Sequence, residues 1–278
     1  MPELPEVETV RRTLAPAVGA TIASAWDSGK PLHMRRKPPR ARLHALVGGK
    51  IAGLRRHGKY LLIDIAHRGV EPTTLIVHLG MTGRLLVCPH AAPRAPHTHV
   101  VLGLGARDLR FVDPRRFGQV DVVATAAERS HAALAQLGPD ALVDGVDGDA
   151  LFARSRGKEA TLKAFVLDQS VLAGVGNIYA SEALWRAQLR PSTRARRLTR
   201  AQAGQLAAAI EEVLRNALDH NGTSLRDFVD AGGAEGTNAD YLWVYGREGE
   251  PCPRCKTRIR RVVHQGRATF YCPTCQRA

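Results

Sequence analysis

Four of the five cysteines lie in residues 251–278, as two Cys-x-x-Cys pairs separated by sixteen residues. The pairs are Cys252 with Cys255 and Cys272 with Cys275. Two tight turns that each present two thiolates can surround one tetrahedral ion, and this spacing is typical of a structural four-cysteine zinc site. The alternative, a thioredoxin-like redox pair, requires a βαβ unit that the pattern does not predict. We therefore expect one structural Zn²⁺, whose binding supplies much of the folding free energy of this short segment.

The stretch between the two cysteine pairs is basic and has the pattern of a hairpin. Residues 258–264 and 267–271 form two short strand patterns, joined by a turn at Gln265-Gly266. Arg267 therefore lies at the hairpin tip. A hairpin pinned by a metal can hold a guanidinium against a phosphate or a base edge, although a solvated tip is the alternative on these residues alone.

The first residues include a proline that could become an N-terminal amine and two glutamates close to it. Removal of Met1 before the small Pro2 would leave a prolyl α-amine at the N-terminus. A model α-amine has a pKa of about 7.7–8.0, against about 10.4 for lysine, so more of it is unprotonated and nucleophilic at neutral pH. Glu3 adjoins this amine and Glu6 follows one helical turn later, where either carboxyl group could exchange protons with it. The alternatives are a processing signal at Pro2 and glutamates that only complement a helix dipole.

The elements that position these residues change type along the chain. Apolar spacing predicts a helix over residues 4–14. The next elements are short apolar runs separated by Gly, Pro, Asn and Asp, at 59–65, 74–79, 99–102 and 119–123. Such regular short strands favour a β-sandwich or barrel over a parallel sheet.

From about residue 127 the periodicity becomes helical. One helix around residues 162–166 breaks at 173–176, and a second begins near Asn177, where its N-terminus is a potential anion site. A capping box, Thr199-x-x-Gln202, opens a third helix that ends at Asn221-Gly222. The pattern predicts an α+β multidomain protein.

Charge and hydropathy restrict the class of partner. The 278 residues carry 40 Lys and Arg against 26 Asp and Glu, a net charge of +14. Such an excess favours a polyanion such as nucleic acid, with a solvated arginine-rich surface as the alternative. No apolar run is long enough to span a bilayer, and the acidic, proline-broken start is unlike a signal peptide, so we expect a cytoplasmic protein without a membrane partner.

Four motifs in order resemble one family, the bacterial formamidopyrimidine-DNA glycosylases. They are the start Met1–Glu8, the stretch Asp113-Pro-Arg-Arg-Phe-Gly118, the stretch Leu167–Glu182 and the ending Gly266–Gln276. The likeness spans the chain and implies an N-terminal β-sandwich (1–126), a helix-two-turn-helix domain (127–240) and a zinc finger (241–278). It also implies a monomeric bifunctional enzyme that excises 8-oxoguanine and formamidopyrimidines from duplex DNA and cleaves the abasic site by β,δ-elimination.

The resemblance also implies roles for individual residues. Pro2 corresponds to the nucleophile that forms a Schiff base, Glu3 to the general acid and Glu6 to a supporting group. Lys59 corresponds to a catalytic lysine near the lesion-flanking phosphate. Arg267 corresponds to a phosphate clamp that is also assigned proton donation in δ-elimination; since arginine hardly ever deprotonates, we favour the clamp.

Further residues match the family's DNA contacts. An enzyme that acts on a base must flip it from the duplex and fill the gap. By resemblance Met81 is the intercalating wedge, and Arg115 and Phe117 face the orphaned cytosine. Backbone contacts are implied for His97, Lys158, Lys163 and Asn177. His78 is a further candidate for DNA binding, with packing within its strand as the alternative.

One loop departs from the family's sequence pattern, and three alternative functions remain open. Residues 232–239 lack the aromatic that the family's base-capping loop often carries, so the preference between 8-oxoguanine and formamidopyrimidine stays open. An endonuclease VIII-like enzyme for oxidised pyrimidines is the nearest alternative, although Leu4 favours the formamidopyrimidine branch. The others are a non-catalytic zinc-finger protein that binds damaged DNA and a zinc-ribbon RNA-binding protein.

Overall fold

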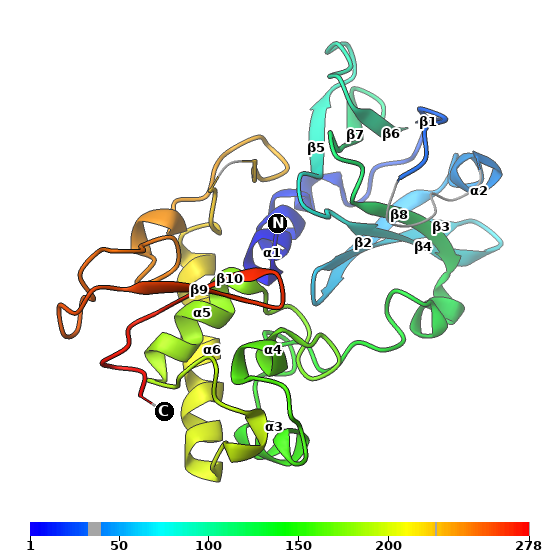
Figure 1. Cartoon of the computed structure of the whole chain (residues 1–278). Coiled ribbons are helices and arrows are strands. Elements are labelled where there is room, and N and C mark those ends of the chain that lie inside the picture. The colour runs from blue at the N-terminus through cyan, green and yellow to red at the C-terminus, as the bar shows by residue number, and fades with distance from the viewer. Residues whose placement is uncertain (33–39, 226, 278) are drawn as a thin grey trace. The chain divides into compact units, whose positions relative to one another are not determined.

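A computed structural model describes residues 1–32, 40–225 and 227–277. The chain divides into two compact units (Figure 1). The first unit comprises Met1–Ala135 and His220–Thr237, and the second comprises Gln136–Asp219 and Asn238–Ala278. Among the helices in the described ranges, none is long and apolar enough to cross a membrane.

The first unit contains two antiparallel four-stranded sheets. One has the strand order β1-β6-β7-β5 and the other β2-β3-β4-β8. The strands are β1 (Ser24–Asp27), β2 (Lys50–His57), β3 (Tyr60–His67), β4 (Val70–His78), β5 (Arg84–Pro89), β6 (Thr98–Gly103), β7 (Arg107–Val112) and β8 (Gln119–Ala124). The helical pieces of this unit are α1 (Leu4–Thr13), α2 (Arg40–His44), η1 (Ala15–Ala17) and η2 (Thr125–Ser130).

Both sheets contribute to one apolar core. Ile63 and Val77 from one sheet and Leu102 and Phe111 from the other belong to the same buried cluster. Val10 on the inner face of α1 joins that cluster, which explains the helical apolar spacing near the N-terminus. The predicted β-rich N-terminal part is therefore confirmed as two sheets around one core.

The segment His220–Thr237 packs within the first unit although it follows the long helix of the second. Phe228 and Ala231 are buried in the core of the two sheets. The Val87 amide donates to the carbonyl oxygen of Ala231 at 2.9 Å, so the segment adds a hydrogen bond at β5. The predicted boundaries at residues 126 and 240 remain a prediction, because the compact units are defined by packing instead of chain order.

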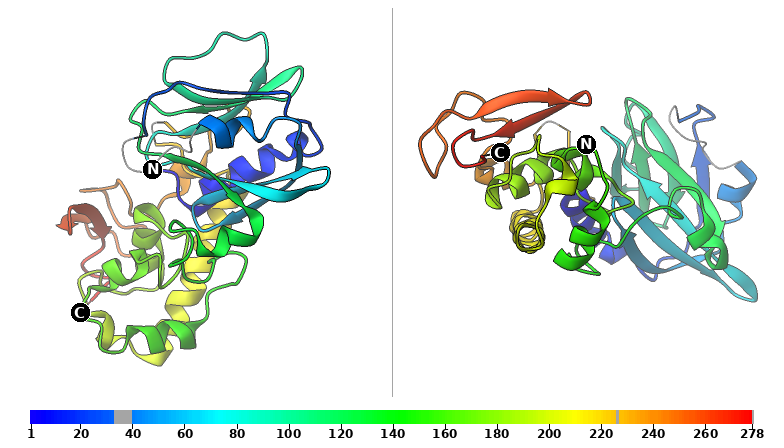
Figure 2. Two further views of the ribbon diagram at one scale, coloured as in Figure 1. Left: turned by 90° about the vertical axis from the view of Figure 1, so that its right-hand side faces the viewer. Right: turned by 60° about the horizontal axis from the view of Figure 1, so that its bottom comes forward.

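The second unit joins helices to a two-stranded hairpin (Figure 2). Its elements are α3 (Gly148–Ser155), α4 (Leu162–Leu167), α5 (Asn177–Arg186), α6 (Arg200–Asp219), η3 (Ala195–Arg197), η4 (Asn238–Tyr241), β9 (Arg260–His264) and β10 (Arg267–Tyr271). The predicted capping box opens α6, since the Gln202 amide donates to the Thr199 hydroxyl at 3.2 Å and the Thr199 amide to Gln202 Oε1 at 3.0 Å. The predicted α+β class, with helical and four-cysteine parts after the sheets, is confirmed.

Candidate functional site

The N-terminal residues are held by a capping box at the start of α1. Pro2 is buried, and so are Glu3 and Glu6, whose side chains lie in the capping box. The Glu3 amide donates to Glu6 Oε2 at 2.8 Å, and the Thr223 amide donates to Glu6 Oε1 at 2.7 Å. Glu6 thus joins the first helical turn to the 220–237 segment. The close approach needs glycine at position 222, where φ is +84° and a Cβ would lie 2.9 Å from Glu6 Oε1.

Lys59 lies in the two-residue turn between β2 and β3, one residue before the strand itself begins. It is 7% exposed, and Gly58 beside it has a φ of +55°. The buried guanidinium of Arg56 donates to the Gly58 carbonyl at 3.0 Å and to Glu8 Oε2 at 3.1 Å. Because Glu8 lies on α1, Arg56 ties the lysine-bearing turn to the helix that begins beside Pro2.

Glu8 is held by three arginines. Burial alone would raise the pKa of its carboxyl group, but hydrogen bonds and charge from Arg11, Arg56 and Arg12 outweigh burial and lower that pKa below its ordinary value. Arg11 and Arg12 approach at 2.7 and 3.0 Å from the same helix. Glu8 therefore stays ionised and anchors Arg56.

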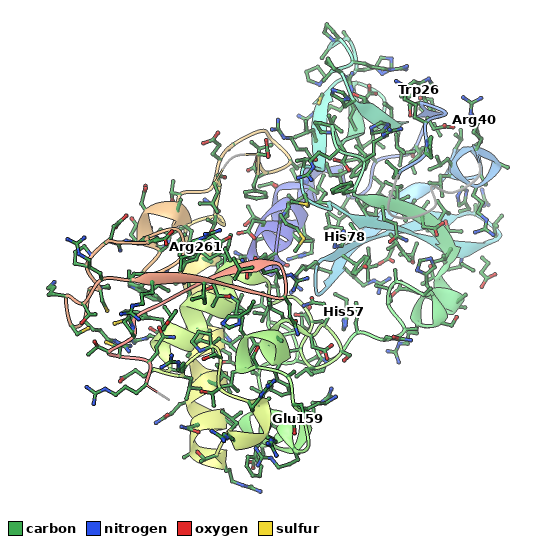
Figure 3. The ribbon with its side chains drawn as sticks, in the orientation of Figure 1. Trp26, Arg40, His57, His78, Glu159 and Arg261 are labelled. Carbon is green, nitrogen blue, oxygen red and sulfur yellow. The ribbon has the colours of Figure 1, made fainter. Side chains whose placement is uncertain are left out.

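Two histidines predicted to contact DNA have different surroundings. His78 ends β4, where its Nδ1 accepts from the Gly80 amide at 3.0 Å and its ring lies 4.7 Å from that of Tyr60. Figure 3 labels His78 and also His57, the residue that pairs with Tyr60 from β2. His97 is exposed, with a φ of +64°. His78 therefore supports the turn that carries Met81, whereas His97 is on the surface.

Met81, the candidate wedge, and Arg115 and Phe117, the candidate contacts to the orphaned base, lie on neighbouring turns of the first unit. Met81 is 41% exposed. The Arg115 guanidinium lies 4.6 Å from the centre of the Phe117 ring. Exposed apolar and cationic groups are therefore presented by turns after β4 and after β7.

Lys163, which is predicted to contact the DNA backbone, is buried in the second unit. It is 1% exposed, and its ammonium donates to the Asn177 carbonyl at 2.8 Å and to the Ser181 hydroxyl. A buried ammonium must be hydrogen-bonded, and these partners hold α4 against the start of α5. The structure thus gives Lys163 an internal packing role, while Lys158 is exposed.

The start of α5 also contacts the hairpin. Asn177 Nδ2 donates to the Ala268 carbonyl at 2.9 Å, one residue from Arg267. Gln265 and Gly266 both have positive φ, 49° and 72°, as a two-residue turn of type I′ requires. The predicted hairpin and its turn are confirmed, and Arg267 is exposed where β10 begins.

The four paired cysteines converge at one point. Their sulfur atoms all lie within 4.8 Å of one another. Four ligands at ~2.3 Å from a tetrahedral ion stand about 3.8 Å apart, and the observed Sγ separations are 3.9 Å for Cys252–Cys275 and 3.4 Å for Cys255–Cys272. The set therefore fits one structural Zn²⁺, as predicted.

The zinc knuckle is packed on the end of α5. Trp185 belongs to the buried cluster that contains Cys252 and Cys272. Arg254, between the first two cysteines, lies 4.3 Å from the Trp185 ring centre and donates to the Trp185 and Arg186 carbonyls at 3.1 and 3.0 Å. The segment with the first two cysteines is therefore packed against the helix that begins at Asn177.

Three positioning residues escaped the sequence interpretation. Arg56 lies three residues before Lys59, Asp113 begins the second family motif and Glu182 ends the third. The Glu182 carboxylate accepts the amides of Trp243 and Tyr245 at 2.8 and 2.7 Å. Burial raises the pKa of Glu182, against these amides and the Lys163 charge, which lower it. The sequence signal was only a charged residue on an otherwise apolar helix face.

The predicted residues fall into two groups. The first unit carries Pro2, Glu3, Glu6, Lys59, His78, Met81, His97, Arg115 and Phe117. The second carries Lys158, Lys163, Asn177, Arg267, Cys252, Cys255, Cys272 and Cys275. Each unit therefore combines candidate residues that are far apart in sequence.

Family models match three parts of the chain. The formamidopyrimidine-DNA glycosylase N-terminal domain matches residues 1–120, and the formamidopyrimidine-DNA glycosylase H2TH domain matches residues 137–229. The zinc finger found in FPG and IleRS matches residues 249–278. These ranges include every predicted site residue.

Full-length relatives and solved structures agree with the family models. The formamidopyrimidine-DNA glycosylase of Cereibacter sphaeroides is 44% identical over the whole of both chains, and that of Herpetosiphon aurantiacus is 45% identical over 99% of this chain and all of its own. A mutant of the Lactococcus lactis FPG in complex with Fapy-dG-containing DNA aligns over all of both chains with a TM-score of 0.91 and 33% identity. A complex of the Lactococcus lactis enzyme with abasic-site DNA gives 0.88 and 32%, over 99% of this chain and all of that one. The chain belongs to the formamidopyrimidine-DNA glycosylase family.

Proposed function

We propose that this chain is a bifunctional DNA glycosylase and abasic-site lyase that removes oxidised purines, including 8-oxoguanine and formamidopyrimidines. The observation that carries the proposal is the N-terminal arrangement: Pro2 precedes a capping box in which Glu3 and Glu6 are buried. The full-length relatives and the DNA-bound Lactococcus lactis structures support it. We also propose a bacterial, nucleoid-associated location.

Pro2 supplies the nucleophile after removal of Met1. The lone pair of the imino nitrogen attacks C1′ of the damaged nucleotide, and the bond from C1′ to the base breaks, so the base leaves with the electron pair and takes up a proton. The nitrogen then loses its proton and its lone pair expels the ring oxygen, so the C1′–O4′ bond breaks, O4′ takes up a proton and an iminium ion forms that has no N–H to lose. Its positive charge acidifies the C2′ proton, which is removed as the C3′–O bond breaks; loss of the 5′ phosphate follows in the δ step.

Glu3, Glu6 and Lys59 assist this chemistry. A carboxyl group beside the amine can transfer a proton to the opening ribose, which is the role proposed for Glu3. Glu6 holds the reacting end in place through the Glu3 and Thr223 amides. Lys59 acts in base release near the lesion-flanking phosphate, and the buried Arg56 fixes the turn that carries it.

Basic groups of the second unit bind the DNA backbone. Arg267 on the hairpin clamps a phosphate, and Lys158 and Asn177 contribute further contacts, as does His97 of the first unit. Met81 fills the space of the flipped nucleotide, and Arg115 and Phe117 face the orphaned base. These assignments follow the family motifs and agree with the exposure of Met81, His97, Lys158 and Arg267.

Oxidised pyrimidines are the second substrate class to test. One solved complex joins the Lactococcus lactis enzyme to DNA that contains an oxidised pyrimidine, and that chain is 33% identical to this one. Matched duplexes with 8-oxoguanine or thymine glycol opposite their normal partners separate the classes. We expect faster release of 8-oxoguanine, and a preference for thymine glycol would replace the purine assignment.

Borohydride reduction tests whether the chain is an enzyme of this type at all. With 8-oxoguanine duplex present, reduction should convert the iminium ion into a stable protein–DNA adduct that is visible as a shifted band. A Pro2→Gly variant is the matched control; it should bind the duplex but give much less adduct and strand cleavage. Binding without any adduct for the native chain would favour a non-catalytic damage-binding protein.

A further inference from the structure

Asp113 lies where two turns of the first unit meet, the turn that carries Met81 and the turn that carries Arg115. Asp113 directly follows β7 in the sequence, and it is completely buried. The Thr82 hydroxyl donates to Asp113 Oδ1 at 2.6 Å, and the Gly118 amide donates to Asp113 Oδ2 at 2.7 Å. The two oxygens of one carboxylate thus hold two turns that are more than thirty positions apart in the sequence.

The two turns are also in backbone contact. Gly80 has a φ of +63°, and a Cβ at this position would lie 2.5 Å from the Gly118 nitrogen and from the Phe117 carbonyl carbon. A Cβ on Gly118 would lie 2.8 Å from the His78 carbonyl oxygen. There is no room for a side chain at either glycine, so the two turns lie in direct backbone contact.

The main chain of Asp113 connects a third segment. Its amide donates to the carbonyl oxygen of the exposed His97 at 3.0 Å, and its carbonyl oxygen lies 3.0 Å from His99 Nε2. Asp113 is therefore linked through its main chain to the His97 turn and through its side chain to the turns of Thr82 and Gly118. Charge-assisted hydrogen bonds of the kind that its carboxylate accepts are about twice as strong as neutral ones.

The residues that these turns display have complementary tasks in the function proposed above, on which this inference rests. Met81 immediately precedes Thr82, and the Arg115 amide lies 3.3 Å from Asp113 Oδ1 and 3.4 Å from the Thr82 hydroxyl. An apolar wedge that opens a base step experiences the restoring force of base stacking, a few kcal/mol per step. A wedge on a loosely held turn would be displaced, and a base-reading guanidinium on an independent turn would not follow it.

We propose that Asp113 and Thr82 are positioning residues that hold the wedge Met81 and the orphan-base pair Arg115 and Phe117 as one rigid element. The element enters the duplex as a unit, so wedge insertion and inspection of the orphaned base occur together. A guanidinium donates only, so it suits the O2 and N3 acceptors of cytosine and discriminates against adenine only while it is held in register. Opposite-base discrimination is therefore set by the hydroxyl-carboxylate contact as well as by Arg115.

The test compares Thr82→Val with Thr82→Ser in the full chain. Valine keeps the shape and removes the hydroxyl, whereas serine restores the donor. The readouts are the ratio of single-turnover excision rates for 8-oxoguanine opposite cytosine and opposite adenine, and the stopped-flow signal of a fluorescent cytosine analogue opposite the lesion. Loss of a hydrogen bond to a charged group predicts roughly a tenfold fall in the rate ratio and a slower signal for Thr82→Val, with recovery to within about twofold for Thr82→Ser.

An unchanged ratio and signal in Thr82→Val, or an equal loss in Thr82→Ser, would overturn the proposal. Asp113→Asn is a second probe. The asparagine NH₂ group would face a donor, either the Thr82 hydroxyl or the Gly118 amide, so this variant should reduce the ratio of the two excision rates at least as much. Borohydride trapping of the native chain on a single-stranded abasic oligonucleotide, which has no orphaned base, tests the proposed function separately. Absence of that adduct contradicts the lyase assignment, whereas an adduct with an unchanged ratio contradicts only the positioning role.

Discussion

Replacing Arg56 by methionine should loosen the turn that carries Lys59. The Arg56 side chain is 1% exposed and lies between α1 and the β2–β3 turn, bonded to Glu8 and to the Gly58 carbonyl. Methionine keeps most of the apolar volume but cannot donate. The change thus separates the hydrogen bonds of the guanidinium from the packing of the stem.

The free-energy cost of Arg56→Met depends on which groups lose a hydrogen-bond partner. A hydrogen bond that involves a charged group contributes about 1.5–3 kcal/mol. Glu8 keeps Arg11 and Arg12, so it is not left as a lone buried charge, which would cost more. We therefore expect Arg56→Met to lower the local free energy of opening by about 2–4 kcal/mol, equivalent to roughly 30- to 1000-fold faster amide exchange in β2 and β3.

Arg12→Met is the matched control. Arg12 bonds to the same carboxylate at 3.0 Å, but its side chain is 55% exposed, and an exposed ion pair contributes about 0–1 kcal/mol. Hydrogen exchange followed by mass spectrometry resolves the peptides of β2 and β3 and avoids the assumption that two compact units unfold together. Equal loss of protection in the two variants would refute the reasoning, because burial would then have no effect.

The remaining predictions concern pH, metal and salt. The lowered pKa of Glu8 means that the stability it contributes is fully present above its unfolded-state pKa and is lost as the pH falls through its folded-state pKa. The difference in unfolding free energy between the native and Glu8→Gln proteins, measured by urea titration, should therefore shrink on acidification. A difference that stays constant with pH would contradict the assignment. Removal of zinc should abolish duplex binding while amide protection in the two sheets persists, and retained affinity would show that the finger is dispensable. If three cations, Lys59, Lys158 and Arg267, contact phosphates, affinity should fall about 40-fold between 50 and 200 mM salt; Lys158→Gln should reduce the salt slope by about one, and a flat response would exclude this interface.

The sequence predicted elements whose signals are local. The capping box at Thr199, the glycine-containing hairpin turn and the paired cysteines each act over a few residues, so they survive whatever tertiary context surrounds them. The apolar runs of β3, β4, β6 and β8 were similarly recognisable. The zinc site could be predicted in full because thiolate pairs have few other uses at this spacing.

Strand β7 lacked such a signal because two of its buried positions are charged. In β7, Asp108 and Arg110 are each 3% exposed, and Arg110 donates to Asp108 at 2.9 Å while also bonding carbonyls of the proline-rich loop. A charged pair of this kind disrupts the apolar pattern on which strand prediction depends. The burial of Lys163 was also missed from the sequence. A lysine is rarely buried unless its ammonium group has partners on another element, and the sequence does not show such partners.

Positioning residues were the least predictable part of the site. Arg56 and Asp113 owe their roles to partners far away in sequence, Glu8 for the first and Thr82 for the second. Neither residue type nor spacing indicates such a partner. Only the fold brings them together.

Identification of the residue that bonds to DNA tests the central claim most directly. Native protein is reduced with borohydride in the presence of 8-oxoguanine duplex, digested, and the cross-linked peptide is sequenced by mass spectrometry. The predicted result is a peptide that begins at Pro2, without Met1, with the sugar remnant on the proline nitrogen. An adduct on Lys59 or another lysine, or an undiminished adduct when the N-terminus is blocked by an uncleaved extension, would contradict the account.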